Sequence, residues 1–195
     1  MIVNMSKHIT QKLIDYDIIN FDDFEVYLYG LQLLLTTVFE IVGIFILGFY
    51  LGWVKEVAIF LIVFGLLRTQ AGGYHANSVL SCFVFTSLFT FICIVIVKNV
   101  YISNSLVFIS LILLISILLV FKYAPKDTPN KPLSKKEYEK YKKNSRLLVL
   151  LLSVAILFIS LIYKSLSAYC SIAALAVLAE SLTLIKNKKR EEVKI

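Results

Sequence analysis

Six long apolar runs, separated by short polar segments, set the pattern of this chain. A helix needs about 17–25 mostly apolar residues to cross the hydrocarbon core of a bilayer. The second run is the shortest, and none of the six contains proline. The pattern predicts an all-α integral membrane protein with a six-helix transmembrane bundle. The predicted spans are 28–51, 54–69, 79–97, 102–121, 147–163 and 167–185.

The first 25 residues have a different pattern, in which apolar side chains recur at helical spacing among charged ones. They are too polar to cross a bilayer, so we expect an amphipathic helix that lies on the membrane surface. The chain then divides into this N-terminal segment (1–25), a polytopic membrane domain (26–185) and a basic tail (186–195).

Composition and charge support the membrane class and predict how the chain is oriented in the membrane. Hydrophobic residues make up 59% of the 195 positions and the mean hydropathy is +0.83, whereas a soluble domain is close to half apolar. Of the 20 Lys and Arg residues, 17 lie in the N-terminal segment, the loops 68–78 and 122–146, and the tail. Basic residues favour the cytoplasmic side. We therefore expect both termini and both loops in the cytoplasm, and no nucleic-acid partner.

The loop at 68–78 and the start of the next run hold the residues that indicate chemistry. A thiol becomes a good nucleophile when a base or a positive field makes it a thiolate. Cys82 lies seven residues after His75, which would be that base. On one helix these residues would be about 10 Å apart, so His75 has to lie on a non-helical loop that folds back over the helix end. Gly72 and Gly73 make such a bend feasible.

The predicted start of the following helix supports this interpretation. If Ser78 or Asn77 caps that helix, Cys82 lies about one turn inside it, where the helix dipole favours a thiolate. Cys93 and Cys170 sit inside apolar runs, and we interpret both as packing residues. The sequence has no CxxC motif and no Cys/His metal spacing, so we expect no metal and no cofactor.

Glu40 lies near the middle of the first predicted span, where a carboxylate is costly and usually marks a site or a paired partner. Three roles are open: a protonated structural group, a contact with a partner helix, or a group that orients His75. Depth argues against direct contact with His75, which should lie near the cytoplasmic face. Gln32 and Asn77 are alternative orienting groups.

The 122–146 loop contains all three prolines of the protein within eight residues. Such a segment is stiff and extended. The charged stretch 133–143 that follows is predicted to form a short surface helix. This basic region either rests on anionic lipid or forms a docking surface for an acidic peptide.

Together these motifs resemble the accessory gene regulator B (AgrB) family. The multi-span, basic layout is similar too, so the resemblance covers most of the chain. The residues that carry it are Arg68, the Gly72-Gly73-x-His75 core, Cys82, and the later loop Ala124-Pro125-x-Asp127-Thr128-x-Asn130-Lys131-Pro132.

The resemblance implies a bacterial membrane cysteine endopeptidase of quorum sensing. Such an enzyme cuts a short precursor peptide near its acidic C-terminal part and holds the N-terminal portion as a thioester. An internal cysteine or serine of the peptide then closes a thiolactone or lactone ring. By position, Cys82 would be the nucleophile and His75 the general base. The resemblance also suggests a homodimer in the cell membrane.

Further candidates for binding the substrate or its oxyanion are Arg68, Gly72, Gly73, Lys131 and Glu40. Arg68 matches the family's basic residue before the loop, and Lys131 falls in its lysine-containing motif. Arg68 has the alternative of snorkelling to the lipid headgroups. The rival interpretation is a non-enzymatic membrane protein, either a small transporter or a scaffold, in which Glu40 and the polar loop line a pathway or a partner interface. A further interpretation is a membrane protease that acts on another class of peptide, such as a lantibiotic-type leader.

Overall fold

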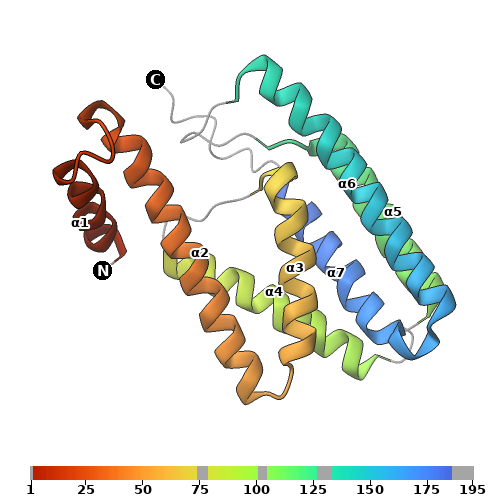
Figure 1. Ribbon diagram of the computed structural model, residues 1–195. Helices are drawn as coiled ribbons and strands as arrows, with labels where there is room; N and C mark the ends of the chain where they lie inside the picture. Colours follow the sequence, from red (N-terminus) through yellow and green to blue (C-terminus); the bar gives the residue numbers. More distant parts are fainter. Residues whose placement is uncertain (1, 74–78, 101–104, 127–132, 186–195) are drawn as a thin grey trace.

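The computed structural model describes residues 2–73, 79–100, 105–126 and 133–185, and these residues form an all-helical bundle (Figure 1). In this part of the chain there is no β-strand, and the single β-bridge pairs Gly72 with Lys126. The elements are α1 (Ile2–Asp15), η1 (Phe21–Asp23), α2 (Phe24–Tyr50), α3 (Val54–Ala71), α4 (Val79–Asn99), α5 (Leu106–Tyr123), α6 (Lys135–Ile162), η3 (Lys164–Leu166) and α7 (Ser167–Thr183).

The predicted all-α membrane class is confirmed, and each of the six predicted runs forms a helix. Among the described residues, α2, α4, α5, α6 and α7 are long and apolar enough to cross a membrane. The helix α3 is not one of these five. Its 18 residues include Lys55, Glu56 and Arg68, too many charges for a span of that length. The count of six spans therefore stays a prediction.

The helix α7 forms the centre of the bundle, and α3, α4, α5 and α6 all pack against it (Figure 1). Small side chains let helix backbones approach closely in a membrane protein. Most of the described α7 residues are buried, and many of them are Ala or Ser. The buried hydroxyls are satisfied within the helix itself: Ser181 Oγ donates to the Val177 carbonyl at 2.7 Å.

Two apolar clusters meet on α7. The first joins α7 to α3, α5 and α6 and contains Cys170. The second joins α7 to α2, α3 and α4 and contains Cys93. Both cysteines are buried, which confirms that they are packing residues.

The N-terminal helix α1 packs along α2 rather than standing apart (Figure 1). Its inner face is small and polar, because Ser6 and Thr10 are fully buried. Their hydroxyls donate to backbone carbonyls of the same helix. Thr10 Oγ1 donates to the Ser6 carbonyl oxygen at 2.8 Å. The outer face of α2 carries exposed apolar side chains such as Val42 and Phe49.

The basic region after α5 differs from the prediction. Instead of a short surface helix at 133–143 followed by a separate span, the chain forms one continuous helix, α6. A capping box starts it: Ser134 Oγ accepts from the Glu137 backbone N–H at 3.3 Å, and the Glu137 carboxylate accepts from the Ser134 N–H at 3.0 Å. With its 28 residues, α6 is about 42 Å long, more than the hydrocarbon core of a bilayer.

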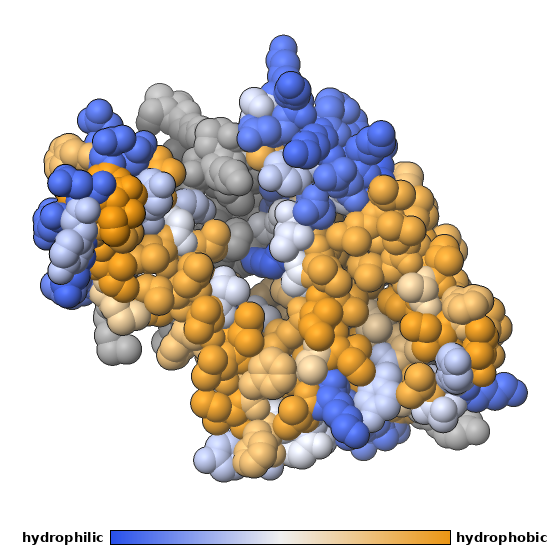
Figure 2. Space-filling model, in the orientation of Figure 1, coloured by the Kyte–Doolittle hydropathy of each residue, from blue (hydrophilic) through white to orange (hydrophobic). Residues whose placement is uncertain are grey.

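The two ends of the bundle are polar and the band between them is apolar (Figure 2). The Gly72–Gly73 turn, Lys126 and the start of α6 lie at one end. The α2–α3 turn and η3 lie at the other (Figure 1).

We predict that positions at these two ends lie on opposite faces of the membrane. In a variant that lacks the three native cysteines, Lys55→Cys and Lys140→Cys should react with an impermeant maleimide from opposite sides, because both lysines are exposed and lie at opposite ends of the bundle. Labelling of both positions from the same side would exclude this topology. Lys164→Cys, at the first residue of η3, serves as a second reporter for the Lys55 side.

Candidate functional site

The candidate residues come from three helices and the turn that follows one of them. Arg68 lies in the last turn of α3, and Gly72 and Gly73 follow that helix. Cys82 lies in α4 and Glu40 in α2. His75, Lys131 and the predicted caps Asn77 and Ser78 lie outside the described residues.

Cys82 is the fourth residue of α4, which begins at Val79. This confirms the predicted position about one turn inside the helix. The N-terminal end of a helix carries a partial positive charge that favours an anion such as a thiolate. Cys82 is half-buried, whereas Cys93 and Cys170 are buried.

Glu40 lies against Cys82, and its carboxyl is close enough to hydrogen-bond the thiol. The two helices cross tightly here. The rings of Phe39 and Phe83 are 5.9 Å apart, and a Cβ on Gly43 would meet a Phe83 ring carbon at 2.6 Å. The expectation that Glu40 does not contact His75 stays a prediction, because His75 lies outside the described residues. The structure places Glu40 beside Cys82, where α4 begins next to the middle of α2 (Figure 1).

Arg68 points into the bundle. Its Nη1 lies 3.2 Å from Oε2 of Glu180, and only 21% of its side chain is exposed. The guanidinium also lies over the Phe64 ring, 5.5 Å from the ring centroid. Electrostatic attraction links it to Glu40 as well, so Arg68 lies within range of two carboxylates.

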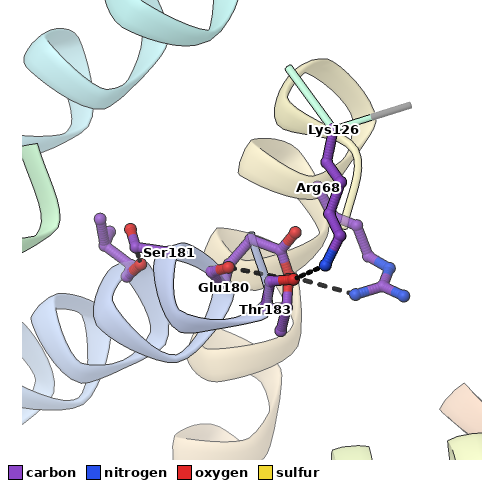
Figure 3. A network of polar contacts seen from close by, with 6 residues as sticks. Arg68, Lys126, Glu180, Ser181 and Thr183 are labelled. Atoms are coloured by element: carbon purple, nitrogen blue, oxygen red, sulfur yellow. Dashed lines mark hydrogen bonds and ion pairs between the residues drawn. The ribbon is translucent and has the colours of Figure 1, made fainter. Parts of the chain in front are cut away.

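Sequence reasoning did not identify Glu180. Its side chain is fully buried in α7, where it receives the Arg68 ion pair (Figure 3). The sequence did contain a signal for this residue, because Glu180 is a charged residue inside the apolar run 167–185. The argument that singled out Glu40 applies equally to Glu180, since a carboxylate inside a span needs a partner.

The Gly72–Gly73 turn is packed against backbone and polar atoms. Gly72 has a φ of +72°, and a Cβ there would lie 2.5 Å from the Lys126 carbonyl oxygen. A Cβ on Gly73 would lie 2.6 Å from Thr183 Oγ1 and 2.7 Å from Glu180 Oε1. Glycine is favoured at Gly72 by its positive φ and a backbone contact, and at Gly73 by its φ of +151°.

Lys126 fixes the beginning of the proline-containing loop to this turn. Its backbone N–H donates to the Ala71 carbonyl at 2.9 Å. Its Nζ donates to the Thr183 carbonyl at 2.7 Å, at the C-terminal end of α7 (Figure 3). A lysine at this position also interacts favourably with the negative end of the helix dipole. The loop that carries the predicted Lys131 thus starts beside the Gly72–Gly73 turn.

Polar surface lies close to these residues. Figure 2 shows a hollow between α2 and α3, with hydrophilic surface exposed inside it. Within the described ranges, no group of three or more His, Cys, Asp or Glu side chains gathers where it would hold a metal ion.

Comparison with known proteins gives one family. A profile of Accessory gene regulator B matches residues 6–184. An AgrB-like protein of Clostridium perfringens strain SM101 is 33% identical over 174 residues, which is 84% of this chain and 80% of that protein. Protein FsrB of Enterococcus faecalis is 29% identical over 132 residues, 67% of this chain and 54% of that protein. No solved structure gives a significant match.

The glycine turn gives a prediction about stability. Gly72→Ala should lower the free energy of unfolding by about 1–3 kcal/mol, because the positive φ strains any residue with a Cβ and the nearby Lys126 oxygen is backbone. Gly65→Ala in α3 is the matched control, because a Cβ there meets nothing within 4 Å. It should be neutral or stabilise by about 0.5–1 kcal/mol. Thermal unfolding of both variants in detergent measures the difference, and equal midpoints would contradict this account.

Proposed function

The chain belongs to the accessory gene regulator B family, and we propose that within it the protein acts as a membrane cysteine endopeptidase on a short pheromone precursor. The family works in accessory gene regulation, the processing of quorum-sensing peptides. The proposal adds the chemistry of that processing: cleavage through a thioester on Cys82, followed by closure of a thiolactone or lactone ring.

The observation that carries the proposal is the position of Cys82. Of the three cysteines it is the one that is not buried, and it lies in the first turn of α4. A nucleophilic thiol needs access for the substrate and a field that favours its anion. Cys93 and Cys170 lack the first of these, since each is enclosed in an apolar cluster.

The proposed reaction has two steps. Cys82 Sγ attacks the carbonyl carbon of the scissile peptide bond, and the C–N bond breaks to leave a thioester and a new amine. His75 takes the thiol proton and gives it to the leaving amine. The thiol or hydroxyl of an internal Cys or Ser in the peptide then attacks the thioester carbonyl. Ring closure breaks the bond to Cys82, and the proton lost by the peptide nucleophile is transferred to Cys82 Sγ.

The second step competes with hydrolysis of the thioester. Cys82 lies next to Glu40 of α2, and the rings of Phe39 and Phe83 pack together beside these two residues, so apolar side chains cover part of the site. Limited water favours attack by the peptide's own nucleophile over attack by water. We propose that the basic residues at the start of α6 attract the acidic end of the precursor. These are Lys135, Lys136, Lys140, Lys142 and Lys143.

The first test is co-expression with a tagged candidate precursor, followed by mass spectrometry of the peptide and of the protein. Cys82→Ala and His75→Ala should both abolish cleavage, and the wild-type protein should carry a precursor fragment as a thioester on Cys82. Cys93→Ala and Cys170→Ala are the matched controls and should cleave normally, because both thiols are packing residues. Cleavage that persists in Cys82→Ala would mean that another protease acts, and would favour the transporter or scaffold interpretation.

A second prediction concerns Glu40. In the resting protein we expect its carboxylate to accept a hydrogen bond from the Cys82 thiol, which holds the thiol in its protonated form. Glu40→Gln should therefore speed alkylation of Cys82 by iodoacetamide several-fold at neutral pH. Glu25→Gln is the control, because Glu25 is an exposed carboxylate in the first turn of the same helix. Slower alkylation in Glu40→Gln would show instead that Glu40 helps to remove the thiol proton.

A further inference from the structure

Glu180 is a fully buried carboxylate in the helix at the centre of the bundle. Burying an ion pair costs desolvation that its mutual attraction often fails to recover, and apolar residues of similar size commonly stabilise a fold as well or better. Stability alone is therefore a weak explanation for the Arg68–Glu180 pair. The segments that the pair contacts suggest a stronger explanation.

Two segments that are distant in sequence meet at the last turns of α7: the end of α3 with its Gly72–Gly73 turn, and the chain at Lys126. The C-terminal turn of α3 arrives through Arg68, whose Nη1 is 3.2 Å from Glu180 Oε2. The backbone of Gly73 passes so close that a Cβ there would lie 2.7 Å from Glu180 Oε1. Lys126 lies beside Arg68 and donates to the Thr183 carbonyl at 2.7 Å (Figure 3).

Each of these segments leads directly into one of the two candidate loops. Gly73 is the last described residue before the connection that carries His75 and leads to Cys82. Lys126 is the last described residue before the connection that carries Lys131. The hydrogen bond from the Lys126 N–H to the Ala71 carbonyl, 2.9 Å long, joins the two starting points directly.

We propose that Glu180 is a positioning residue of the peptidase site, which acts through Arg68 and Gly73 to hold the start of the His75 connection against the start of the Lys131 connection. We call Arg68, Glu180 and Lys126, with the Gly72–Gly73 turn, the clamp. The inference rests on the proposed function, because it assigns the clamp to the same reaction. Its role is to keep Gly73 and Lys126, the residues from which the two connections start, in one fixed relation.

The clamp also controls where the Arg68 charge lies. Arg68 is attracted to Glu40 beside Cys82 as well as to Glu180. When Glu180 loses its charge, Glu40 is a carboxylate that still attracts Arg68. A shift of Arg68 toward Glu40 would neutralise the carboxylate that opposes thiolate formation. Loss of Glu180 should therefore uncouple two properties: the reactivity of the Cys82 thiol and the cleavage of the peptide.

The experiment compares Glu180→Gln with Glu56→Gln in the full-length protein in membranes. The control is matched, because Glu56 forms an ion pair with Lys98 at 2.9 Å at the opposite end of α3. Precursor cleavage is measured at saturating peptide, alkylation of Cys82 by iodoacetamide is followed by mass spectrometry, and thermal unfolding reports the folded fraction. Cys82→Ala is run beside them with the same precursor.

We expect Glu180→Gln to cleave about tenfold more slowly or worse, because small displacements of catalytic groups have large effects on rate. Alkylation of Cys82 should be as fast as in the wild type or faster, and Glu56→Gln should keep both rates. Arg68→Gln combined with Glu180→Gln should be no worse than Arg68→Gln alone, since the two residues act as one unit. A merely structural role would instead lower cleavage in proportion to the folded fraction, and the cleavage rate per folded molecule would stay at the wild-type value.

Two results would overturn the proposal: wild-type cleavage in Glu180→Gln, or equal loss in Glu180→Gln and Glu56→Gln. Cleavage that persists in Cys82→Ala would instead overturn the proposed function itself. If Glu180→Gln does not fold, Lys126→Met tests the clamp from its partly exposed side, with Lys55→Met as its control. Lys126→Met should slow cleavage while Cys82 alkylation is retained, and unchanged cleavage in this variant would contradict the clamp.

Discussion

A carboxylate inside an apolar bundle keeps its charge only where cations and hydrogen-bond donors surround it. Arg68 supplies a cation to Oε2 of Glu180, while Oε1 is buried without a hydrogen-bond partner among the described residues. The pairing brings the end of α3 onto the last turns of α7. The chain that leaves α3 must then pass directly over the ion pair, where there is room only for glycine. The position of the turn, and of Lys126 against it, follows from one buried charge.

The helix α7 can meet so many neighbours because its side chains are small. Ala174 and Ala176 are fully buried, and they face the two apolar clusters on either side of the helix. Larger residues would hold α3, α4 and α5 further from the axis of α7. A separation of that kind would place Arg68 out of reach of Glu180, so the composition of α7 and the ion pair depend on each other.

Helix positions were predictable because a span is a local pattern of apolar residues, and the turn on which Cys82 lies follows from the polar break before it. The pairing of Arg68 with Glu180 could not be predicted from the sequence, because 112 positions separate the two residues. The contact between Glu40 and Cys82 depends on where α4 crosses α2, which no local pattern encodes. The α6 prediction failed for another reason: a change from charged to apolar residues indicates a change of surroundings, not a break in the helix.

The uninterrupted course of α6 has a consequence for the range of its charges. From Lys135 to Arg146 the helix rises about 16 Å along its axis, and Asn144 is hydrogen-bonded to Gln70 at the end of α3. The Debye length at physiological ionic strength is about 8 Å, so a charge two such lengths from a headgroup is largely screened from it. The first lysines of α6 are therefore held on a continuous helix about two Debye lengths from Arg146. At that separation their field adds little to the charge beside the bundle and acts mainly on solutes that come close to the helix start.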